Sequence, residues 1–391
     1  MSAPSTNTGI AASRTLIRED PAKVWGNGMV SDFERRLRRY EKTALHPDSL
    51  EAWQPLFKDL LERFNIFAAD RAKAQAPGHA VAIGFSEDYK YNAIARTDDE
   101  GDLIAISANV PVSLERAFNR ALCFKEVIPF AGTFDEDHVD PDPIDPKDLV
   151  CGLRSNVPRI VPSNQIRSNL AKLLTTVAMD FVFEHEMGHV WNGHTSYANA
   201  LGISAYEEIE KSPDTRISGT DYQTLEMDAD VFAGTAMTVQ KLRPQPWLPM
   251  IADWENKFGA GSTILSLQMF AVYFALRIVD EAATLADVQM RKHPPIYVRH
   301  FHILGAWTGA LSRRTGRDEK DTHEIIASVT RGVEGAFAAL TGRKFDPAGI
   351  IMAYGPEARE YANTLLKNWP RLRPQLDPLK RGGNLAPVTE F

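Results

Sequence analysis

Apolar side chains recur every three or four residues along the segment that leads to a cluster of histidines. The pattern consists of Leu170, Leu173, Leu174, Val177 and Phe181. Steps of this size place side chains on one face of an α-helix. His185 and His189 continue the same face by further steps of four residues. The sequence therefore predicts one long helix whose buried face carries two imidazole groups side by side.

Other segments predict further helices around a short β region. Helical spacing is found at residues 33–40 and 53–64, and again from about residue 304 onward. Residues 80–107 instead alternate between apolar and polar, with a turn at 98–102, which is typical of paired strands. The predicted fold class is α+β, mostly helical, with a small β-sheet before the histidine helix.

The residue types on the histidine helix are those of a zinc site. Two imidazoles one helical turn apart can bind one zinc ion with nitrogen–metal distances of roughly 2 Å. Glu186 follows His185 directly, where its carboxylate can polarise a metal-bound water. The competing interpretation is a helix with two ordinary buried histidines.

A catalytic zinc site needs a third protein ligand and one open position for water. His194 is close in sequence, but nine residues after His185 it lies about 180° around a continuing helix. It could bind the metal only if the helix ended first. The position instead favours a role in capping the carbonyl end of the helix.

Glu226 is the stronger candidate for the third ligand. It lies in an apparent second helix, Leu225-Glu-Met-Asp-Ala-Asp-Val-Phe-Ala-Gly, about 37 residues after His189. Glu226 and Asp230 share one face, because they are four residues apart, whereas Asp228 points elsewhere. One carboxylate could bind the metal while Asp230 holds a ligand imidazole by its distal N–H. A solvated acidic helix face is the alternative.

These residues resemble the gluzincin zinc metallopeptidases, which include the HtpX and Oma enzymes. Their helix reads His-Glu-x-Gly-His and their third ligand lies in Glu-x-x-Ala-Asp-x-x-Ala, as in His185–His189 and Glu226–Ala233. Residues 91–95 and 103–107 resemble the strand pair that precedes the helix in that family. His293-Pro-Pro and Arg299 resemble its later His-Pro-x-x-x-x-Arg segment.

The resemblance implies a zincin-like, zinc-dependent endopeptidase acting on a protein or peptide substrate. His185, His189 and Glu226 would hold Zn²⁺, and Glu186 would be the general base. His293 or Arg299 would assist at the developing oxyanion, and the strand pair would form the edge along which the substrate lies. The alternative function is a protein-binding module whose metal is structural or vestigial.

Composition divides the chain into three predicted regions. Residues 1–27 are polar with scattered Pro and Gly, so we expect them to form a flexible arm. Residues 28–310 are predicted to form the catalytic region, and residues 311–391 a helical C-terminal region. Residues 131–148 hold seven acids and three prolines, which favours an exposed insertion. That insertion is either a solvated loop or a lid over the active-site cleft.

Composition and charge also limit the partners and the compartment. The 391-residue chain has a net charge of −7, which argues against nucleic acid or an anionic membrane as a main partner. Residues 264–276 are too few to span a bilayer, and the start of the chain lacks a basic region followed by an apolar run. Two cysteines fit a reducing compartment. We therefore expect a cytoplasmic protein, similar to the soluble Lit phage-exclusion peptidases.

Overall fold

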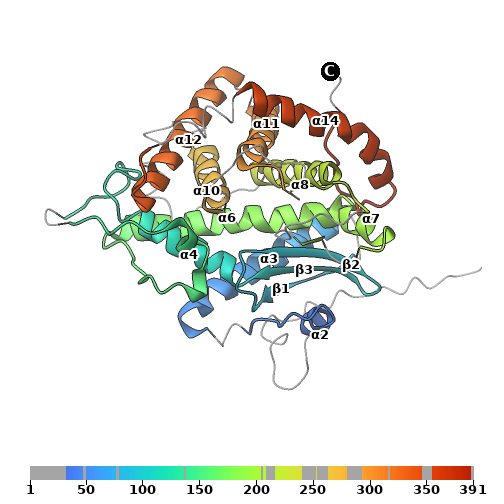
Figure 1. Ribbon diagram of the computed structural model, residues 1–391, viewed down its shortest axis with the longest axis horizontal. Coiled ribbons are helices and arrows are strands. Elements are labelled where there is room, and N and C mark those ends of the chain that lie inside the picture. Colours follow the sequence, from blue (N-terminus) through green and yellow to red (C-terminus); the bar gives the residue numbers. More distant parts are fainter. Residues whose placement is uncertain are drawn as a thin grey trace, which may run out of the picture.

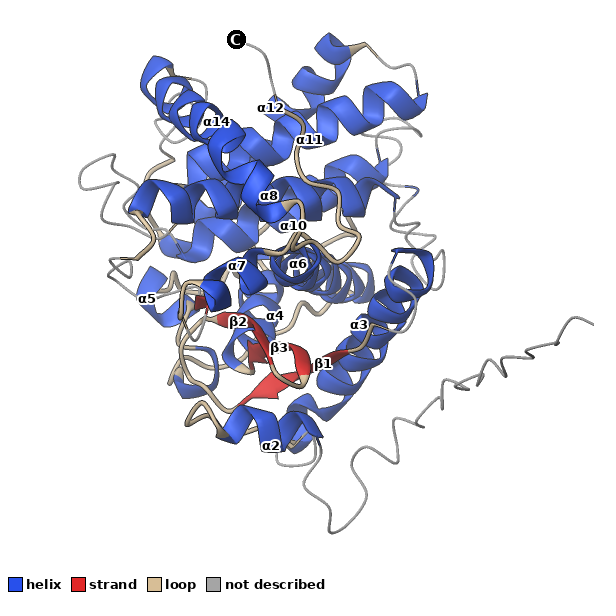
Figure 2. Ribbon diagram, turned by 90° about the vertical axis from the view of Figure 1, so that its right-hand side faces the viewer, coloured by secondary structure: helices blue, strands red, loops and turns tan. Residues whose placement is uncertain are grey.

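The computed structural model describes residues 32–46, 50–75, 79–135, 138–203, 206–207, 216–239, 252, 263–279, 293–315, 318–345 and 355–388. In this part of the chain the fold is mostly helical, with one small β-sheet (Figures 1 and 2). The predicted α+β class is confirmed. The predicted arm at residues 1–27 lies outside the described residues.

One long helix, α6 (Gln165–Trp191), crosses the middle of the molecule between the sheet and the remaining helices (Figure 1). Asn164 caps its start, because its side-chain oxygen accepts hydrogen bonds from the backbone N–H groups of Ile166 and Arg167. The predicted apolar face is buried, and His185 and His189 lie near the C-terminal end of this helix. Gly193, with φ +83°, then separates α6 from the short helix α7 (His194–Ala200).

The sheet lies on one side of α6 and has the strand order β1-β3-β2-β4. Its strands are β1 (Val81–Ser86), β2 (Ala93–Asp98), β3 (Gly101–Ser107) and β4 (Tyr206–Glu207). β1 runs parallel to β3, whereas β2 is antiparallel to it and joined by the predicted turn. The strands predicted between residues 80 and 107 are therefore confirmed. On its other side β2 pairs with β4 at Ile94 and Ala95.

Three helices lie around the sheet: α2 (Asp32–Arg38), α3 (Gln54–Gln75) and α4 (Asn109–Ala121). Two of them, α3 and α4, also pack against α6. Two buried acids of α6 pair with arginines of α3: Arg63 Nη2 lies 2.5 Å from Asp180 Oδ2, and Arg71 Nη2 lies 2.6 Å from Glu184 Oε2. These pairs hold α6 against α3, just N-terminal to the two histidines.

Helices from the second half of the chain cover the other side of α6. They are α8 (Gly219–Val239), α10 (Thr263–Val279), α11 (Ile296–Thr315), α12 (Glu319–Thr341) and α14 (Pro356–Leu376). Gly188 allows α8 to come close, because a Cβ at this position would lie 3.2 Å from the Ala229 Cα. Buried residues of all these helices belong to one hydrophobic core, which extends across residue 310.

The acidic insertion packs at the opposite end of α6 from the histidines. The described part contacts α12 and the end of α4, since the Ile144 N–H donates to the Leu340 carbonyl and Arg120 donates to the Asp142 carbonyl. Phe134 packs against the guanidinium of Arg167, which is about 27 Å along the helix from His185. The described part of the insertion therefore does not cover these histidines.

Among the described residues, α10 is the helix with the most apolar sequence. No helix in the described part of the chain is both long enough and apolar enough to cross a membrane.

Candidate metal centre

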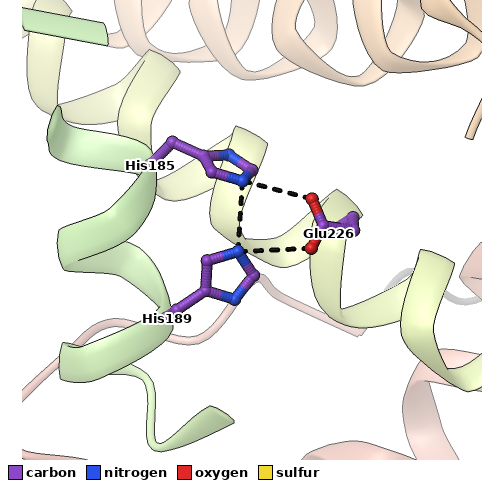
Figure 3. Close-up of side chains that lie close together, drawn as sticks. All are labelled: His185, His189 and Glu226. Atoms are coloured by element: carbon purple, nitrogen blue, oxygen red, sulfur yellow. Dashed lines mark hydrogen bonds and ion pairs between the residues drawn. The ribbon is translucent and has the colours of Figure 1, made fainter. Parts of the chain in front are cut away.

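His185, His189 and Glu226 bring one nitrogen or oxygen atom each to a single point between α6 and α8 (Figure 3). Nε2 of His185 lies 3.1 Å from Nε2 of His189. The Glu226 carboxylate lies opposite both rings, with Oε2 3.2 Å from His185 Nε2 and Oε1 3.3 Å from His189 Nε2, so the ligand triangle of these three residues includes both carboxylate oxygens. All three side chains are buried. The structure thus brings together the three residues that the sequence nominated as metal ligands.

The size of this triangle fits a zinc ion. Ligand atoms at about 2.0–2.1 Å from a tetrahedral zinc ion lie about 3.3 Å from each other. The three contacts here, which use both carboxylate oxygens, are close to this value, and with one ligand atom per residue the atoms lie within 4.8 Å of one another. Two buried imidazole nitrogens and a carboxylate oxygen that converge in this way would repel one another if each offered a lone pair. A cation among them removes that repulsion, so the donor set fits a metal both in size and in charge.

Burial and close contacts set the protonation of the cluster. Burial raises the pKa of Glu226, but the nearby His293 and the hydrogen-bonded imidazoles of His189 and His185 outweigh burial and hold the pKa well below its usual range. Burial lowers the pKa of His189 to about 3. Burial lowers the pKa of His185, but its contacts with Asp230 and Glu226 outweigh burial and raise it well above its usual range. Without a metal, Glu226 is therefore ionised, His189 neutral and His185 protonated at pH 7, and metal binding would require His185 to lose a proton.

Asp230 lies beside His185, where the sequence placed it. Its Oδ1 is 2.9 Å from Nδ1 of His185, on the side of the ring away from the cluster. Burial raises the pKa of Asp230, but Arg299 and His185 outweigh it and lower the pKa to about 2. An ionised Asp230 can fix the tautomer and the orientation of the His185 ring.

Arg299 lies behind Asp230 and not beside the three convergent atoms. Its Nε and Nη2 donate to Oδ2 and Oδ1 of Asp230 at 2.9 and 2.8 Å. The bidentate pair is buried, so the carboxylate is locked in place. The guanidinium is turned to Asp230 because a buried carboxylate needs a charged partner, and assistance by Arg299 at the oxyanion stays a prediction.

His293 and Glu186 are the two remaining candidates for catalysis. Nδ1 of His293 lies 2.8 Å from Oε2 of Glu226, and this side chain is 22% exposed, far more than the ligand side chains. Glu186 is buried. From helix geometry, its side chain points about 100° around the helix axis from that of His185 and about 60° from that of His189. Both positions suit groups that meet a substrate at the metal, and both catalytic roles stay predictions.

His194 occupies a different place from the one expected. It begins α7, and its ring is fully buried between His189 and Asp228 instead of capping the end of α6. The cap was a wrong expectation because Gly193 turns the chain back into a new helix at this point. Neither His194 nor Asp228 contributes an atom to the ligand triangle.

The family comparison adds an independent line of evidence. A sequence model of the Peptidase U49 family matches residues 113–310, about half of the chain. The chain belongs to the Peptidase U49 family. It is therefore a member of a peptidase family, which implies a protein substrate.

The matched residues run from α4 to α11 and include every candidate site residue named above. The soluble Lit-type peptidases, to which the sequence is similar, belong to this family. No curated protein and no solved structure matched the chain.

Sequence reasoning missed two pairings at this centre, Arg299 with Asp230 and His194 with Asp228. For the first there was a signal, because a buried acid beside a metal ligand requires a positive partner. For the second the signal was partial: Gly193 could mark the end of the helix, but the partner Asp228 lies on another helix and could not be identified.

Proposed function

We propose that this member of the Peptidase U49 family is a zinc-dependent endopeptidase of the gluzincin type. His185, His189 and Glu226 would hold the metal and leave a fourth position for water. The observation that carries the proposal is the ligand triangle, in which buried donor atoms of three residues lie within 4.8 Å of one another and each imidazole Nε2 faces a carboxylate oxygen at 3.2 or 3.3 Å.

Bound zinc would supply Lewis-acid activation of the attacking water and of the scissile carbonyl. Glu186 takes the proton from the water during attack and delivers it to the leaving amine. Glu186 is not one of the three triangle residues. His293, at the exposed side of Glu226, is placed to contact the carbonyl oxygen as negative charge develops.

The proposal predicts that the protein creates new protein termini in a cell lysate. Purified zinc-loaded protein is incubated with the lysate, and the termini are sequenced beside those from protein treated with a chelator. We expect new termini that form with the zinc-loaded protein, are absent with the chelated protein, and form again when zinc is added back to the chelated protein. An identical set of termini with loaded and chelated protein would favour the alternative, a module that binds proteins without cutting them.

Removal of Asp230 should weaken zinc binding without abolishing it. Asp230→Ala removes the partner of His185 Nδ1 and leaves the Arg299 guanidinium buried without its carboxylate. Loss of such a partner typically lowers metal affinity by about 10 to 100-fold. Asp230→Asn still accepts a hydrogen bond and should lose less. Zinc titration against a competing chelator measures both, and an unchanged affinity in Asp230→Ala would remove this residue from the centre.

A further inference from the structure

The His194 ring links the ligand His189 to a buried carboxylate, Asp228. Nδ1 of His194 lies 3.0 Å from Nδ1 of His189, and Nε2 of His194 lies 3.1 Å from Oδ2 of Asp228. His194 and Asp228 are both fully buried, so water does not compete for these contacts. They come from different elements, since His194 begins α7 and Asp228 lies on α8, two residues after Glu226.

The three groups can share one consistent arrangement of protons. Nε2 of His189 faces Glu226, so Nδ1 of this ring is the nitrogen that carries hydrogen when a metal is bound. His194 can accept that N–H at its own Nδ1 and donate its Nε2–H to the Asp228 carboxylate, because a neutral imidazole has one donor and one acceptor. Two hydrogen bonds in series thus connect His189 to a negative charge.

The Asp228 carboxylate accepts two further hydrogen bonds. Its Oδ2 accepts from the Asn192 amide at 2.5 Å, and its Oδ1 accepts from the Ala386 backbone N–H at 2.7 Å. Residues 381–386 follow α14 and close over the end of α6, where the backbone N–H groups of Arg381 and Gly383 donate to the Trp191 carbonyl at 2.8 and 3.1 Å. This C-terminal segment lies outside the region that matches the family.

We propose that His194 and Asp228 position the His189 imidazole for the metal, and that residues 381–386 hold Asp228 in place. The arrangement mirrors the one at His185, where Asp230 and Arg299 take the corresponding positions. A hydrogen-bonded acceptor behind a ligand imidazole fixes its tautomer and raises its basicity. The inference rests on the proposed zinc site, and it assigns positioning roles to residues that do not touch the metal.

Two substitutions of His194 separate positioning from simple packing. In His194→Asn the side-chain oxygen reaches the place of Nδ1, so His189 keeps an acceptor. In His194→Gln the terminal amide reaches the place of Nε2, so Asp228 keeps a donor while His189 loses its acceptor. We expect His194→Gln to weaken zinc affinity by about 10 to 100-fold. The zinc affinity of His194→Asn should lie between that of His194→Gln and that of the unchanged protein.

Zinc affinity is measured by chelator competition, and the visible spectrum of the cobalt-loaded protein reports ligand geometry independently of activity. Thermal unfolding of the metal-free forms corrects for any loss of stability. His300→Gln is the matched control, because His300 is an equally buried histidine that contacts Thr330 instead of a ligand. The control should keep the affinity and the cobalt spectrum.

If His194→Gln folds poorly, Asp228→Asn provides a second variant that keeps the shape and loses the charge. It should also weaken zinc binding and alter the cobalt spectrum. Unchanged affinity in His194→Gln or in Asp228→Asn would overturn the proposal, as would an equal loss in His194→Asn and His194→Gln.

The role of the C-terminal segment is tested at Gly383. A Cβ at this position would overlap the side-chain oxygen of Asn192 and the carbonyl oxygen of Trp191, so Gly383→Ala must displace the segment. We expect zinc affinity to fall. Gly335→Ala is the control, because a Cβ there meets nothing within 4 Å. Equal affinities in the two variants would exclude the segment from the metal centre.

Failure of this inference can be told apart from failure of the proposed function. A protein that binds no zinc, or that binds it without Glu226, contradicts the metal site itself. A protein that needs Glu226 for zinc but is indifferent to His194 and Asp228 contradicts only the positioning roles.

Discussion

Glu186→Gln should lower peptide-bond cleavage by about 10² to 10⁴-fold, the usual contribution of a general base. The amide keeps the shape of the side chain but cannot take a proton from water. Because Glu186 is outside the ligand triangle, zinc content and fold should stay unchanged. The measurement is kcat/KM on the substrate identified from the new termini, together with metal analysis and thermal unfolding of the same preparations.

Glu184→Gln is the matched control for this experiment. Glu184 lies two residues earlier on α6, is equally buried, and faces Arg71 of α3 instead of the metal centre. Its neutralisation leaves Arg71 without its charged partner, so thermal stability should fall. Cleavage per folded, zinc-loaded molecule should be kept. Equal cleavage by wild type and Glu186→Gln would remove Glu186 from the mechanism, whatever the behaviour of the control.

The sequence predicted the parts of this fold that depend on local periodicity. The long helix with both histidines on its buried face, the paired strands before it and the helical second half all follow from spacing alone, and the structure contains each of them. Glu226 could be nominated for the same reason, because residues four apart on a helix share a face.

The arrangement between elements could not be read from periodicity. The carboxylate of Asp230 was expected near a ligand histidine, but its partner Arg299 is 69 residues away and reaches it only through the packing of α11 on α8. Likewise Asp228 was assigned no partner, although its surroundings include Ala386, 158 residues later. Contacts of this kind depend on how the helices pack, and a single sequence holds no periodic signal for that.

The position of the acidic insertion along α6 could not be predicted for the same reason. Its composition indicates exposure and says nothing about which end of α6 it adjoins. In the structure Arg167 fixes the start of this region, because its buried guanidinium donates to the carbonyl oxygens of Ile128 and Ala131 at 3.1 and 2.8 Å. A buried arginine without an acid nearby in sequence must find such acceptors, and the chain supplies them far from the metal centre.

The second large effect is expected at Glu226. Purified protein should contain about one zinc ion per chain, and Glu226→Ala should lose most of it, because two imidazoles alone do not complete a catalytic zinc site. Glu226→Gln keeps the volume and replaces a charged oxygen by a neutral one, so it should retain more zinc than Glu226→Ala but less than the unchanged protein. Elemental analysis after dialysis against a weak chelator measures all three.

Two controls decide whether Glu226 acts as a ligand or only supports the fold. Glu334→Ala removes another buried glutamate, which pairs with Tyr273 and Arg277 away from the centre, and should lower thermal stability while zinc is kept. His194→Ala should keep about one zinc per chain under the same conditions, because a positioning residue lowers affinity without removing a ligand. Full zinc content in Glu226→Ala with loss in His194→Ala would reverse the two roles, and the triangle in Figure 3 would then not be the metal site.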